Sequence, residues 1–139
     1  MSLREKSAWI TLVTVLLCFG VYYGAVFTGA VPAHSMAMLH LALVCVLTLI
    51  ILQVGLTILA AITTPKDGRG PRDERERMIQ ARSHTIGYHV LMVCTGALII
   101  PTHMRGVNMV DIANYAFLGL VISTIVVAAA QIIMFRRGY

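Results

Sequence analysis

Histidine and methionine side chains gather in two short segments of this sequence. They are His34, Met36, Met38 and His40 in the first segment, and His103 and Met104 in the second. Thioether sulfur and imidazole nitrogen are soft ligands that suit Cu(I), so one hypothesis is a copper site at these residues. The competing interpretation is that the methionines pack at a helix start and the histidines are solvated.

Haem binding is a related hypothesis, because a four-helix bundle can hold haem between two histidines on facing helices. Within one chain, His40 and His103 form the pair that such a site would use, and a pair across a dimer would serve equally.

Polar residues also continue from a charged segment into an apolar one. On a helix, residues three, four and seven apart share a face, and this spacing connects Asp73, Glu76/Arg77, Gln80, Ser83/His84 and Gly87/Tyr88 into one polar stripe. A solvated helix start is one explanation, since Asp73 followed by Glu76 has the spacing of a capping box. That explanation does not account for polar side chains that lie further along the helix.

His89 lies deeper in the same apolar segment. An ionisable side chain inside a membrane span is a functional candidate by default. The alternative is a neutral imidazole that hydrogen-bonds to Gln131 or Gln53, the polar residues in the inner halves of two other spans.

Four long apolar stretches must position these side chains. The 139 residues are 58% hydrophobic and 12% charged, and their mean hydropathy is +0.83. A soluble domain of this length needs far more polar surface, so we predict an integral membrane protein of the all-α class. The expected architecture is an up-down-up-down four-helix bundle, a single transmembrane domain over residues 1–139. Its expected helices cover residues 7–27, 36–63, 73–100 and 111–135, with 73–84 as a cytoplasmic extension.

The basic residues predict the orientation. All of the eleven Lys and Arg residues except Arg105 fall before the first stretch, between the second and third, or after the fourth. Loops rich in Lys and Arg stay in the cytoplasm, so both termini are expected inside the cytoplasmic (inner) membrane. The same placement explains the net charge of +5 by lipid headgroups and topology, and argues against nucleic acid as a partner.

Small residues at helical spacing predict close helix packing. Gly20 and Gly24 form one such step, and Gly119 and Ser123 form another, which can act within the bundle or between protomers. We expect a homo-oligomer, with a dimer favoured. A shift of 76 residues also aligns Cys18 with Cys94 and nearby positions, which suggests two related hairpins.

A motif before the third stretch resembles a known family. Asp-Glu-Arg-Glu-Arg-Met-Ile, then Arg-Ser, then Ile-Gly-Tyr-His is similar to the motif of an uncharacterised family of small four-span prokaryotic membrane proteins. His89 stands where that motif often has a second Tyr. The resemblance implies a membrane fold, and it marks as candidates Asp73, Glu74, Arg75, Glu76, Arg82, Ser83 and Tyr88.

Catalytic motifs are absent from the sequence, which has no nucleophile elbow, P-loop, His-Glu-x-x-His or dinucleotide turn. The leading hypothesis is therefore a non-enzymatic module that binds a cytoplasmic protein partner or anionic lipid. The residues expected to bind are Asp73, Glu74, Arg75, Glu76, Arg77, Arg82 and Ser83.

A small oligomeric channel or transporter is the second hypothesis. It rests on the intramembrane polar residues Gln53, His84, Tyr88, His89 and Gln131. The third hypothesis is the copper or haem site, and a protein without a bound cofactor is favoured over it.

Overall fold

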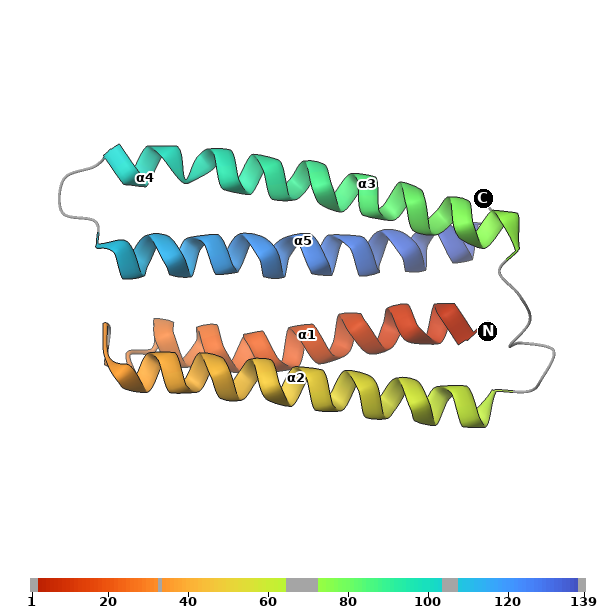
Figure 1. The fold of residues 1–139 in the computed structure, drawn as a ribbon, viewed down its shortest axis with the longest axis horizontal. Helices are drawn as coiled ribbons and strands as arrows, with labels where there is room; N and C mark the ends of the chain where they lie inside the picture. The colour runs from red at the N-terminus through yellow and green to blue at the C-terminus, as the bar shows by residue number, and fades with distance from the viewer. Residues whose placement is uncertain (1–2, 33, 65–72, 104–107, 138–139) are drawn as a thin grey trace. The chain divides into compact units, whose positions relative to one another are not determined.

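A computed structural model shows an all-helical chain (Figure 1). It describes residues 3–32, 34–64, 73–103 and 108–137, and within these ranges the regular structure is helical with no strand. The elements are α1 (Leu3–Phe27), α2 (Met36–Thr63), α3 (Glu74–Ala97), α4 (Ile99–His103) and α5 (Met109–Arg137). The predicted all-α class is confirmed.

Four helical segments are long and apolar enough to cross a membrane. They are Leu3–Phe27, Met36–Thr63, Glu74–His103, which combines α3 and α4, and Met109–Arg137. An apolar helix satisfies its own backbone hydrogen bonds, which is the requirement that the bilayer interior imposes on any segment that spans it. The fold is therefore consistent with a multi-pass helical membrane protein.

The chain divides into two compact units. The first unit, Met1–Pro71, is a hairpin in which α1 packs against α2. The second unit, Arg72–Tyr139, is a hairpin in which α3 packs against α5, with α4 next to α3 (Figure 1).

The turn of the first hairpin is built from a helix end and a helix cap. The Ala30 N–H donates to the Ala25 carbonyl at 3.1 Å, and the Gly29 N–H donates to the Val26 carbonyl at 3.3 Å, which is the Schellman pattern. Gly29 has a φ of +70°, a conformation that glycine adopts without the strain of a Cβ. Ser35 then caps α2 by accepting a hydrogen bond from the Met38 N–H.

The third predicted helix is interrupted before Pro101 rather than ending there. α3 ends at Ala97, and α4 then carries the helical conformation on to His103. Proline has no N–H to donate to the carbonyl four residues earlier, and its ring crowds that carbonyl, which here belongs to Ala97. Proline is tolerated in the first turn of a new helix, and Pro101 takes that position in α4.

α1 and α5 extend beyond the apolar stretches that predict them, whereas α2 has the predicted bounds. α1 begins at Leu3 rather than Ser7, and α5 covers Met109–Arg137 rather than 111–135. The added residues include Arg4, Lys6 and Arg136, which are good helix formers, so the helical backbone continues past the apolar core. Asp111 consequently lies in the first turn of α5.

A close approach of backbones holds the second hairpin together. The Ser123 hydroxyl of α5 donates to the Gly87 carbonyl of α3 at 2.7 Å, and both residues are buried. A Cβ added at Gly87 would collide with the Cγ2 methyl of Val127, and one added at Gly119 would lie 3.0 Å from the Cβ of Cys94. A residue without a side chain therefore fits best at these two contacts between the helices.

Polar side chains connect the two helices of the first hairpin. The Gln53 amide of α2 donates to the Thr11 hydroxyl of α1 at 2.9 Å. At the C-terminal end of α2, the Lys6 ammonium donates to the Thr64 hydroxyl at 3.2 Å. Thr64 in turn donates to the Ala60 carbonyl at 2.6 Å. These contacts fix the register of α1 against α2 at two levels.

Replacing Gly87 by Ala should destabilise the second hairpin. The added methyl meets the Val127 side chain, so Val127 must change its rotamer or α3 must move away from α5, at a cost of about 1–3 kcal/mol for an overpacked contact. Thermal unfolding of the purified protein in detergent measures the effect. Gly96→Ala is the matched control, because a Cβ at Gly96 meets nothing within 4 Å.

A second substitution tests whether the loss comes from this particular contact. Val127→Ala removes the methyl that the new Cβ would meet, so the double variant should recover part of the stability lost by Gly87→Ala. Equal unfolding temperatures for Gly87→Ala and Gly96→Ala would show that α3 and α5 do not approach at Gly87.

Candidate functional site

The charged start of α3 is the candidate site for a binding partner. We call it the α3 start and define it as residues 73–82. Asp73 is the N-cap of the helix, with extended backbone dihedrals, and its carbonyl accepts a hydrogen bond from the Arg77 N–H at 3.1 Å. Acidic residues in this first turn suit the positive end of the helix dipole.

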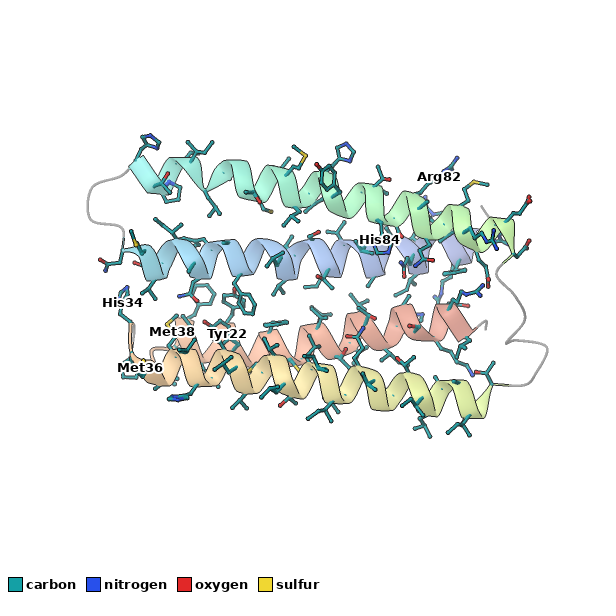
Figure 2. All side chains as sticks on the ribbon, in the orientation of Figure 1. Tyr22, His34, Met36, Met38, Arg82 and His84 are labelled. Atoms are coloured by element: carbon teal, nitrogen blue, oxygen red, sulfur yellow. The ribbon has the colours of Figure 1, made fainter. Side chains whose placement is uncertain are left out.

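Most charged side chains of the α3 start are exposed. The exposed ones are Asp73, Glu74, Arg75, Arg77 and Arg82, and the half-buried one is Glu76. Figure 2 shows Arg82 and His84 on the first half of α3. The α3 start therefore carries exposed carboxylates and guanidinium groups on neighbouring residues.

Ser83 differs from the other residues predicted to bind a partner. Its exposed fraction is 0%, and its hydroxyl donates to the Gln80 carbonyl of the same helix at 2.9 Å. Ser83 lies one turn before Gly87 and one turn after Ile79, and all three are buried. This spacing assigns Ser83 to the packed face of α3 rather than to the exposed surface.

The polar stripe expected along α3 is divided between two sides of the helix. Gly87 belongs to the side that packs on α5, whereas Arg77, His84 and Tyr88 are exposed. The rings of Tyr88 and His89 lie edge to face, with 6.0 Å between their centroids.

His89 and Gln53 have partners other than each other. The Nδ1 atom of His89 lies 2.7 Å from the Thr85 carbonyl on its own helix. Gln53 donates to Thr11 within the first hairpin, and Gln131 is half-buried in α5. A hydrogen bond to the preceding turn lowers the cost of a polar group in the bilayer, which favours a structural role for His89.

The histidines and methionines of the copper hypothesis do not share one face. Met38 is buried with 7% of its surface exposed, whereas Met36 is 69% exposed and His40 is also exposed. Met36 and His40 are one turn apart and share a side of α2, so Met38 points elsewhere. Figure 2 labels His34, which is exposed, next to these methionines where the first hairpin turns.

The other two residues of the copper hypothesis, His103 and Met104, belong to the second unit. His103 is exposed at the end of α4, where its Nδ1 atom lies 2.9 Å from the Ile99 carbonyl. Met104 lies outside the described residues. Among the residues that are described, no three His, Cys, Asp or Glu side chains gather in a way that could hold a metal ion.

The four small residues expected to pack helices have two different environments. Gly119 and Ser123 are buried on α5 against α3. Gly20 and Gly24 are exposed on α1, and a Cβ added at either meets nothing within 4 Å. The small residues of α5 therefore contact α3, whereas the strip formed by Gly20 and Gly24 on α1 is open.

Three structural contacts were not expected from the sequence. They are Gly87 against Val127, Thr11 with Gln53, and Lys6 with Thr64. The Ser83-x-x-x-Gly87 spacing is a signal for the first, because it is the same small-residue step as Gly119-x-x-x-Ser123. The other two are pairings between distant positions, for which spacing along one helix gives no signal.

The arrangement defines a class of protein: helical, with four segments able to cross a membrane and a charged helix start at the end of one of them. Comparison with protein-family models, with curated proteins and with solved structures finds no match for the chain. The resemblance of the α3 motif to a family of small four-span proteins accordingly stays a prediction.

Removing the Gln53 amide should loosen the first hairpin. Gln53→Leu and Thr11→Val each remove one partner of the hydrogen bond, and such bonds between membrane helices are worth about 0.6 kcal/mol on average. Unfolding of both single variants and the double variant in detergent gives the coupling energy. Strict additivity of the two effects would show that the two side chains do not interact.

Proposed function

We propose that this chain is a non-enzymatic multi-pass protein of the cytoplasmic (inner) membrane whose α3 start binds a cytoplasmic protein. The observation that carries the proposal is the exposed cluster of both charge signs at the beginning of a helix that is otherwise able to cross a membrane. A helix that continues from such a cluster into the bilayer gives a docked partner a rigid attachment.

The proposed orientation puts the α3 start in the cytoplasm. It rests on the basic residues, which gather at the beginning of α1, at the beginning of α3 and at the end of α5. In the proposed orientation these three helix ends face the cytoplasm. In this arrangement the spans run up-down-up-down, and both termini lie in the cytoplasm.

The pattern of charge favours a protein partner over a lipid surface. Basic and acidic residues of the α3 start balance each other: Arg75, Arg77 and Arg82 against Asp73, Glu74 and Glu76. Anionic lipids attract clusters of Lys and Arg, and they repel carboxylates at the same surface. A protein surface with complementary charges can satisfy both signs and gains specificity from their order.

We further propose that the protein forms a homodimer. Gly20 and Gly24 support this, because their strip on α1 is open to close approach by another helix. A two-fold pairing of the same strip on two copies would be self-complementary.

A small channel or transporter is the second candidate function. It rests on the Tyr88 ring, which lies edge to face with His89 on the exposed side of α3, away from the contact with α5. Polar side chains in a span usually mark either a solute path or a contact with another helix.

Cysteine labelling should establish the orientation. In a variant whose native Cys18, Cys45 and Cys94 are replaced by Ala, a cysteine at Asn108 should react with an impermeant maleimide in intact cells. A cysteine at Arg75 should react only after the membrane is opened. The reverse pattern would show that the α3 start faces away from the cytoplasm.

A photo-crosslinking amino acid at Arg77 tests the proposed docking. We expect one discrete crosslinked protein in native membranes and none from the same amino acid at Asn108, an exposed position at the start of α5. Exchanging the charges with Glu74→Arg and Arg75→Glu keeps the net charge, and should reduce the product about fivefold or more, equivalent to about 1 kcal/mol.

The charge exchange separates the two kinds of partner. A lipid surface responds to net charge, so binding to lipid would survive the exchange and weaken only when Arg75 and Arg77 are both neutralised. A crosslinked product of unchanged yield in the exchanged variant would contradict recognition of the charge order.

A further inference from the structure

The first hairpin contains an apolar groove with a positive charge at its mouth. It lies between the beginning of α1 and the end of α2 and has a volume of about 410 Å³. Its lining consists of Lys6, Trp9, Ile10, Leu56, Leu59, Ala60 and Thr63. All of these residues belong to the first unit, so the groove is a property of that hairpin alone.

The Lys6 ammonium is held at the mouth of the groove. It donates to the Thr64 hydroxyl at 3.2 Å, and Thr64 is buried and bonded to the Ala60 carbonyl one turn earlier. An ammonium group carries three N–H donors, and this contact uses one of them. The anchored stem therefore presents further donors to an anion at the same place.

The dimensions and chemistry of the groove match one lipid chain below its headgroup. Leu56 and Thr63 are seven residues apart, about 10 Å along the helix, which compares with about 15 Å for one leaflet of the hydrocarbon core. Trp9 adds a ring of the kind that settles at the boundary between headgroups and acyl chains. In a membrane that α1 and α2 cross, this end of the hairpin would lie at that boundary.

We propose that this groove is a binding site for one anionic phospholipid, with its phosphate on Lys6 and one acyl chain between Ile10 and Leu59. The charge complementarity of an ammonium and a phosphodiester selects an anionic headgroup, and the apolar walls select the chain. The site lies in the first hairpin, so the inference does not depend on docking at the α3 start.

Native mass spectrometry of the full chain, exchanged into bilayer discs, tests the site. The probes are phosphatidylglycerol and phosphatidylcholine with identical acyl chains. Phosphatidylglycerol should be retained preferentially, and Lys6→Gln should lower its retention about fivefold, the effect of about one basic residue at a membrane surface. Arg136→Gln is the control, since it removes one positive charge outside the groove and should leave the preference unchanged.

A second variant tests the groove independently of charge. Ala60→Leu fills the space between Ile10 and Leu59 while Lys6 is kept, so retention of both lipids should fall. Helix content and thermal unfolding of each variant show whether the hairpin still folds. In the folded protein, a photoactivatable phosphatidylglycerol should label peptides that contain residues 6–10 and 56–63.

Several results would overturn the proposal. An equal loss for Lys6→Gln and Arg136→Gln would mean that only overall charge attracts the lipid. Undiminished retention in folded Ala60→Leu, or labelling confined to other peptides, would show that the lipid lies elsewhere. Crosslinks from the groove to residues of α3 or α5, or to a second copy, would show that protein covers it.

Discussion

Helices surrounded by lipid gain little from burying apolar side chains against each other, because the lipid tails are equally apolar. Their pairing depends instead on close van der Waals contact and on hydrogen bonds between helices. α3 and α5 meet this requirement at Gly87, where the Ser123 hydroxyl reaches the Gly87 carbonyl at 2.7 Å. The orientation of α3, and so the direction in which its charged start faces, follows from which side of the helix carries Gly87.

The helices of the two hairpins are held together by different kinds of contact. The second uses small residues and a backbone acceptor, whereas the first uses side-chain hydrogen bonds from Gln53 and Lys6. At Gly87 an added methyl would collide with the Val127 side chain, so this contact requires the smallest residue. Both hairpins also have a groove between their helices, of about 410 Å³ between α1 and α2 and about 300 Å³ where the end of α3 and α4 face α5.

Composition and spacing along the sequence predicted the helical class and the approximate position of every long helix, because apolar length and charged ends are local signals. The predicted end of the third helix at residue 100 is wrong, because the missing Pro101 N–H leaves the carbonyl one turn earlier, at Ala97, without its donor, and α3 ends there. Ser83 was grouped with exposed charged neighbours, although its spacing from Gly87 places it on the packed side. The partner of Gln53 depends on how α1 and α2 are aligned, which no pattern within either helix encodes.

The length of α2 has a consequence for how the first hairpin sits in a bilayer. Its 28 residues contain no Asp, Glu, Lys or Arg, and they extend about 42 Å, against a hydrocarbon core of about 30 Å. Such a mismatch is relieved when the helix tilts or when the surrounding bilayer thickens. Since Lys6 and Gln53 tie α1 to α2 at two levels, α1 must incline together with its partner. The tilt of this hairpin therefore depends on the thickness of the membrane, and in a thinner bilayer both helices tilt further from the membrane normal.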